Sequence, residues 1–135
     1  MSERMTKDEL DAQRTLGALN PVGHAILVFP SSAVAADAKK ALLGAGFADA
    51  DIVSYSAREL FPDLDTMMRN ASGAAGFGYE ITLMRRYMAL ASEGCAFLVV
   101  YVPEDEQTAK ATEVAKRFGA KSAVRYARLA SEDLI

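Results

Sequence analysis

Two short apolar runs, HAILVF at 24–29 and AFLVVYV at 96–102, constrain the fold of this chain most strongly. An uninterrupted apolar run bounded by Gly or Pro is typical of a strand that is buried on both faces. Each run leads through a proline into a helical segment and then into a more polar strand. When Pro30 is aligned with Pro103, the glycines that end the two helices coincide. The repeat predicts two strand–helix–strand units in one sheet.

The fold follows from how two such units combine. Helices are predicted over 33–45 and 105–118, and mixed-polarity strands over 49–56 and 121–129. Right-handed crossovers place the first strand of each unit in the centre of the sheet and the mixed strands at its edges. We therefore predict an α+β sandwich of the ferredoxin-like type, βαβ–(helical insert)–βαβ, with a four-stranded antiparallel sheet.

The remaining segments are predicted to be helical additions to this plan. Residues 1–20 are predicted as an N-terminal helical extension, and 21–135 as the ferredoxin-like domain with a helical insert at 57–95. Within the insert, apolar spacing predicts a helix over 79–93. Two capping boxes mark helix starts, Thr6 with Glu9 and Ser56 with Glu59.

Composition excludes several classes of protein. The chain has 135 residues and a net charge of −3, whereas a nucleic-acid-binding module is normally basic. A single cysteine and a single histidine leave no basis for an internal disulfide or a multi-ligand metal site. No apolar run reaches the roughly 18–20 residues that span a bilayer, and no secretory segment opens the chain. We expect a cytoplasmic protein without membrane, nucleic-acid, metal or cofactor partners.

Two longer stretches resemble a known family. "ALLGAGFADADIVSYS" and the later "LASEGCAFLVVYVPEDEQTAKATEVAKRFGAKSAVRY" are similar to the bacterial general stress protein domain of the heat-induced stress protein type. The similarity covers roughly 25–56 and 80–126, and that family often has a glycine-rich segment between its halves. It has no established catalytic residues, so the resemblance implies a small protein without catalytic machinery.

The stretch ASGAAGFGYE, residues 71–80, has two interpretations. Its Gly-x-x-Gly-x-Gly spacing matches neither the dinucleotide fingerprint nor the P-loop, so a flexible connector is one interpretation. Backbone N–H groups close to a helix start can also hold an anion. The residues of such a site would be Gly73, Gly76, Gly78, Arg69, Arg85 and Arg86.

Other reactive residues carry structural interpretations. Cys95 and His24 begin adjacent antiparallel strands and should lie on the order of 15–20 Å apart, beyond the reach of a catalytic dyad. The acidic residues at 104–106 are interpreted as the negatively charged first turn of a helix. Asp63 and Asp65 are interpreted in the same way, as an N-cap and first turn, and a cation site is the alternative for this pair. A basic run is predicted as a solvated face: Lys116, Arg117, Lys121, Arg125 and Arg128.

The sequence thus supports two classes of function. The first is a non-catalytic stress-type protein that acts through self-association or partner binding. The second is a small-molecule or anion-binding regulatory module, or a dimeric ferredoxin-like enzyme, with a pocket. Polar groups for that pocket are Tyr55, Tyr87, Tyr101, Arg85 and His24.

Strand polarity predicts a symmetric homodimer. Both central strands are apolar on both faces, while two helices cover one face of the sheet, so the other face would expose a large apolar patch. The insert helix covers part of this face, and a second subunit is expected to cover the rest. The predicted interface residues are Met67, Met68, Met84, Tyr87 and Met88.

Overall fold

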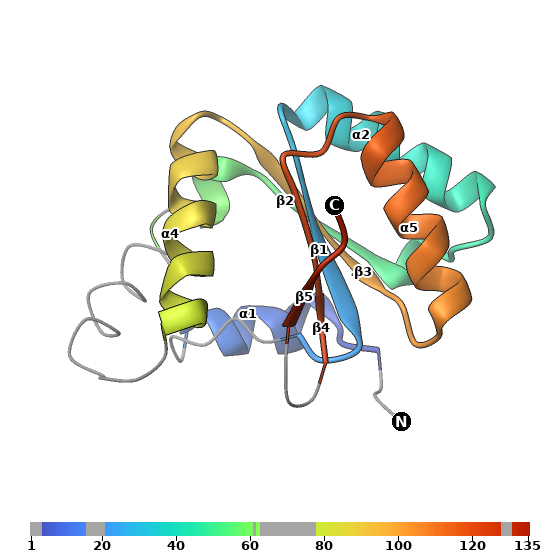
Figure 1. Cartoon of the computed structure of the whole chain (residues 1–135), viewed down its shortest axis with the longest axis horizontal. Coiled ribbons are helices and arrows are strands. Elements are labelled where there is room, and N and C mark those ends of the chain that lie inside the picture. Colours follow the sequence, from blue (N-terminus) through green and yellow to red (C-terminus); the bar gives the residue numbers. More distant parts are fainter. Residues whose placement is uncertain (1–3, 16–20, 61, 63–77, 128–130) are drawn as a thin grey trace.

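The computed structural model describes residues 4–15, 21–60, 62, 78–127 and 131–135, which form an antiparallel sheet between helices (Figure 1). The strand order is β2-β3-β1-β4-β5, and every neighbouring pair is antiparallel. The α+β class and the antiparallel sheet are confirmed. The strands are β1 (His24–Phe29), β2 (Ile52–Tyr55), β3 (Ala96–Tyr101), β4 (Ser122–Tyr126) and β5 (Ser131–Asp133).

The prediction of four strands was wrong, because the described residues contain five. β5 pairs with β4, with Val124 opposite Asp133 and Tyr126 opposite Ser131. The segment predicted as an edge strand at 121–129 therefore contributes β4 to the interior of the sheet, and β5 forms the edge. The three residues of β5 are Ser, Glu and Asp, so no apolar alternation marks this strand in the sequence.

The two apolar runs form adjacent strands inside the sheet, as their composition predicts. All six residues of β1 are buried, and in β3 all but Tyr101 are buried. The register runs from His24 opposite Tyr101 to Phe29 opposite Ala96. Successive side chains alternate between the faces, so both faces of these strands need apolar cover.

Two helices cover the first face of the sheet. They are α2 (Ser32–Gly44) and α5 (Asp105–Arg117), which lie side by side in Figure 1. The Ser31 hydroxyl accepts a hydrogen bond from the Val34 N–H at 3.2 Å and caps α2. The core of this face contains Leu27, Phe29, Leu42, Leu98 and Val114.

The second face is covered by helices of the same chain. These are α1 (Lys7–Thr15) and α4 (Gly78–Ser92), with α4 on the opposite side of the sheet from α2 and α5 (Figure 1). Their fully buried Leu10 and Tyr87 pack in one cluster with Ile26, Val28 and Phe97. The face that was expected to need a second subunit is therefore covered by α1 and α4 in the described part of the chain.

Both predicted capping boxes are confirmed. The Thr6 N–H donates to Glu9 Oε1, and the Glu9 N–H donates to Thr6 Oγ1, each at 3.2 Å. Ser56 and Glu59 form the same reciprocal pair, at 3.0 and 3.2 Å, before a helical turn at 57–60. Among the described residues, no helix is long and apolar enough to cross a membrane.

Candidate functional site

A polar cavity of about 170 Å³ opens where β3 ends and α5 begins. It lies at the end of the sheet where β1 starts, because His24 is paired with Tyr101. The walls come from the end of α2, the 3₁₀ helix η1 (Asp49–Asp51), the end of β3 and the first turns of α5. The lining residues are Ala45, Gly46, Phe47, Asp51, Tyr101, Pro103, Gln107 and Lys110.

A glycine shapes one wall of the polar cavity. Gly46 has φ +109°, a left-handed conformation that side chains disfavour, and it ends α2. The chain then turns so that Phe47 is buried against the first face. A Cβ at Gly46 would lie 4.0 Å from Lys110 Nζ, so the ammonium of Lys110 lies next to this turn.

Gln107 and Lys110 give the cavity its binding chemistry. They are three residues apart on α5 and therefore lie on one face of the helix. Lys110 Nζ contacts Glu106 Oε1 at 3.5 Å, a long ion pair with a mostly exposed acid. The Oε1 atom of Gln107 is buried and has no hydrogen-bond partner in the described part of the structure. The cavity lining thus includes a cationic residue, Lys110, and a residue with an unused acceptor, Gln107.

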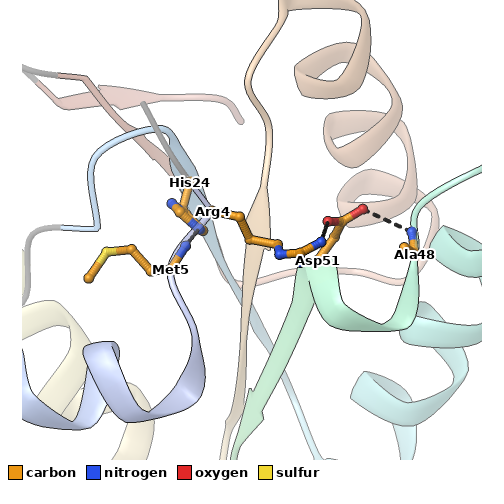
Figure 2. A network of polar contacts seen from close by, with 5 residues as sticks. All are labelled: Arg4, Met5, His24, Ala48 and Asp51. Atoms are coloured by element: carbon orange, nitrogen blue, oxygen red, sulfur yellow. Dashed lines mark hydrogen bonds and ion pairs between the residues drawn. The ribbon is translucent and has the colours of Figure 1, made fainter. Parts of the chain in front are cut away.

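Asp51 also lines the cavity, but its charge is compensated. Its Oδ1 accepts a hydrogen bond from Arg4 Nη1 at 3.1 Å, and its Oδ2 accepts one from the Ala48 N–H at 2.9 Å. Figure 2 shows Arg4 reaching across to Asp51 from the N-terminal segment, which we define as residues 4–15. The N-terminal segment is therefore connected to the cavity wall through one ion pair.

His24 does not line the cavity but contacts the same N-terminal segment, close to Met5 (Figure 2). The Met5 N–H donates to its Nε2 at 3.1 Å, and its Nδ1 lies 3.0 Å from the Val22 carbonyl oxygen. Because a backbone N–H can only donate, Nε2 must be unprotonated and the single ring proton must sit on Nδ1. The ring also packs against Tyr101, with 5.1 Å between centroids. Burial lowers the pKa of His24, which keeps the ring neutral.

The glycine-rich anion site falls largely outside the described residues, as do Asp63, Asp65 and Arg128. Gly73, Gly76, Arg69, Met67 and Met68 belong to the same undescribed part, while Gly78 begins α4. Arg85 is exposed on α4. Arg86 donates to Asp133 Oδ1 at 2.9 Å and to Ser122 Oγ at 3.3 Å, which connects α4 to β4 and β5. This arginine thus has a structural role.

Cys95 and His24 do not form a dyad. Cys95 immediately precedes β3, beside the end of β1, whereas His24 starts β1. Five residue steps of an antiparallel strand separate these ends by about 17 Å. Burial raises the pKa of the Cys95 thiol, so the thiolate that a nucleophile needs is disfavoured. The strand register confirms the predicted separation.

The tyrosines proposed as pocket groups divide between two places. Tyr101 lines the polar cavity, and the His24 ring packs against Tyr101 without lining the cavity itself. The Tyr55 hydroxyl donates to Asp11 Oδ1 at 2.9 Å, and the hydroxyls of Tyr87 and Tyr126 lie 2.7 Å apart, both in the second-face cluster. Sequence reasoning missed Asp51, Gln107 and Lys110, although the three-residue spacing on α5 is visible in the sequence.

The acidic residues at the start of α5 have structural roles in the first turn of the helix. Glu104 is the N-cap residue, without a side-chain capping bond. Asp105 Oδ1 accepts from Arg125 Nη1 at 3.4 Å, and Glu106 contacts Lys110. Negative charge at a helix start is favourable, as predicted. Among the described residues, no group of three His, Cys, Asp or Glu side chains could hold a metal ion.

Comparisons with protein-family models, with curated proteins and with solved structures found no match to this chain. The resemblance to stress proteins therefore stays a prediction from sequence, and the assignment of function must begin from the polar cavity.

Proposed function

We propose that this chain is a non-catalytic binding protein that holds a small polar ligand in the polar cavity. This is the small-molecule alternative of the sequence analysis. The observation that carries it is a cavity lined by both Lys110 and Gln107, in which the buried Oε1 of Gln107 has no partner among the described residues. A matching ligand has an anionic group for Lys110 and an N–H or O–H donor for Gln107.

The surroundings of the cavity favour binding over catalysis. His24 uses both ring nitrogens in hydrogen bonds, so it has no free nitrogen to act as a general base, and Asp51 is held in an ion pair with Arg4 and in a hydrogen bond with the Ala48 N–H. Phe47 and Pro103 give the cavity an apolar wall, which is typical of small-molecule sites.

A thermal-shift experiment with matched ligands tests this proposal. Acetate supplies a carboxylate without a donor, and inorganic phosphate supplies an anion of another shape with its own P–OH donor at neutral pH. Glycolate and glycine combine a carboxylate with a hydroxyl or amino donor. We expect these two to raise the melting temperature more than acetate does at equal concentration. Equal responses to all four, or none, would contradict the proposed ligand class.

Variants identify the site in the same assay. Lys110→Met and Gln107→Leu should each remove the response, because one deletes the cation and the other the acceptor. Lys116→Met changes an exposed lysine of the same helix and should leave the response intact. A response that survives both cavity variants would place the binding site elsewhere.

We also propose that the core is a ferredoxin-like fold with an added edge strand. Support comes from the order β2-β3-β1-β4 within the sheet and from the helices α2 and α5, each of which connects the two strands of its unit. In this proposal β5 extends the four-stranded plan. Kinship with the stress proteins, a cytoplasmic location and the absence of nucleic-acid partners stay predictions from composition and resemblance.

Self-association is a second proposal, and it rests on α4. Met84 and Met88 are half-buried and pack at the border of the second-face cluster, so each leaves apolar surface outside the chain. Tyr87, in contrast, is 1% exposed and contacts its own chain. A symmetric dimer would therefore use the outer side of α4 and not the sheet itself.

A further inference from the structure

We infer that neutral His24 holds the N-terminal segment against the sheet, and that protonation of His24 releases this segment and weakens ligand binding in the polar cavity. The first half depends only on the contacts of His24. The second half rests on the proposed function, because it describes how binding in the same cavity is regulated.

The hydrogen bonds of His24 require a neutral ring. Nε2 accepts from the Met5 N–H at 3.1 Å, and Nδ1 donates to the Val22 carbonyl at 3.0 Å. A proton on Nε2 would set two donors face to face, so the bond to Met5 would be lost. It would also place a positive charge on a side chain that is 1% exposed. Both effects disfavour the attached state of the N-terminal segment.

The charged groups around the ring do not reverse this balance. Asp51 of η1 and Glu9 of α1 favour the protonated imidazolium. Their effect on the pKa of His24 is smaller than the opposing effect of burial. Asp51 already accepts hydrogen bonds from Arg4 and Ala48, and Glu9 accepts one from the Thr6 N–H. From β3 the ring meets the aromatic face of Tyr101.

The direction of the pH effect follows from the lowered pKa of His24. In the released state the ring is less buried, so its pKa lies closer to the usual value and it binds a proton more readily than in the attached state. The contribution of His24 to attachment is complete above pH 6.5 and is lost as the pH falls from there toward the pKa of the attached state. Mild acid therefore favours release.

The N-terminal segment has further contacts besides the bond to His24. Leu10 is fully buried in the second-face cluster, and Asp11 accepts the Tyr55 hydroxyl at 2.9 Å. Lys7 lies 3.5 Å from Glu59 in an exposed ion pair, which contributes little in water. The part-buried bond to His24 is thus one of several contacts that hold the segment, and it is the one that depends on the protonation of His24.

Release changes the charge of the cavity wall. Arg4 belongs to the N-terminal segment and compensates Asp51 at 3.1 Å. When Arg4 leaves, the Asp51 carboxylate faces the cavity uncompensated and repels an anionic ligand. One additional charge several ångströms from the ligand at a protein surface weakens binding by roughly five- to tenfold.

Hydrogen exchange tests the release step directly. Exchange of residues 7–15 is measured at about pH 7.5 and 5.5, with correction for the intrinsic rate. NMR follows the tautomer and titration of His24, the single histidine of the chain. We expect protection of 7–15 to fall by about tenfold as His24 titrates. Titration of His24 with unchanged protection would overturn the inference.

Two variants distinguish the effect of the hydrogen bond between His24 and Met5 from the general effects of low pH on the protein. His24→Gln cannot titrate, so the protection of 7–15 should become independent of pH. Met5→Pro removes the N–H donor and keeps His24, so the segment should exchange rapidly at both pH values even if the first variant folds poorly. Full protection in Met5→Pro, or a pH effect that survives in His24→Gln, would refute the role of this bond.

Glycolate and glycine titrations test the coupling to the cavity. Binding should weaken by roughly five- to tenfold from pH 7.5 to 5.5, and Arg4→Met should cause a similar loss at pH 7.5. Binding that is equal at both pH values while the segment is released would refute the coupling. If neither ligand binds at pH 7.5, the proposed function fails, whereas the exchange experiment still decides whether His24 holds the segment.

Discussion

The buried pair of Tyr87 and Tyr126 shows what single residues contribute to this fold. Their hydroxyls lie 2.7 Å apart, between α4 and β4, on the second face of the sheet. We predict that Tyr87→Phe lowers the free energy of unfolding by about 1 kcal/mol, because it removes a buried hydrogen bond and keeps the ring. Urea denaturation measures the change.

A double-mutant cycle provides the control for this pair. Tyr126→Phe alone should cost a similar amount, and the double variant should cost clearly less than the sum, since both single changes delete the same bond. Additive costs would show that the two hydroxyls do not interact.

At the same scale, the sequence predicted only part of the candidate site. His24 and Tyr101 were named as polar pocket groups, and of these two Tyr101 lines the cavity while His24 packs against Tyr101. Gln107 and Lys110 were not predicted as site residues, because polar residues three positions apart are common on exposed helix faces. Their recess exists only where α2, η1, β3 and α5 meet, which no local pattern specifies.

At the scale of elements, the capping residues at helix starts allow a test of local stability. Thr6→Ala removes the hydroxyl that accepts the Glu9 N–H at 3.2 Å, and we expect it to destabilise α1 by about 1 kcal/mol. Because α1 lies in the N-terminal segment, hydrogen exchange should speed up in 7–15 with little effect on β1 and β3.

Ser31→Ala is the matched control for this prediction. It removes the cap of α2, which packs on the central core, so its cost should appear in global unfolding and in every protected strand. If both variants changed exchange in the same way, α1 would open only when the whole protein unfolds.

Elements with strong local signals were predicted well. The apolar runs, the glycine helix ends and the capping boxes all act within a few residues, and they identified β1, β3, α2, α5 and α4 to within two residues at each end. β5 was missed because its formation depends on backbone pairing with β4 and on no property of its own side chains.

For the whole molecule, the testable property is the oligomeric state. The sequence argument for a dimer required an uncovered apolar face, and α1 and α4 cover that face within the described residues. The feature that still favours a dimer is the half-buried pair of Met84 and Met88 on α4. We predict a dimer in sedimentation at micromolar concentration that Met84→Lys together with Met88→Lys converts to a monomer.

A folded monomer before any substitution would contradict that prediction and would leave ligand binding as the remaining proposal. Tyr87→Phe serves as the control in this experiment, because Tyr87 is buried in its own chain and its hydroxyl should not alter association.

The position of β1 in the sheet has a consequence for the synthesis of the protein. Both strands that pair with β1 come from the second half of the chain, and even the nearest partner, Ala96 opposite Phe29, is far along the sequence. Ribosomes add about 5–20 residues per second, so the apolar run HAILVF waits for seconds without either neighbour. During that interval the nascent chain exposes an apolar strand without its paired neighbours, and this makes association with other chains most favourable at that stage of synthesis.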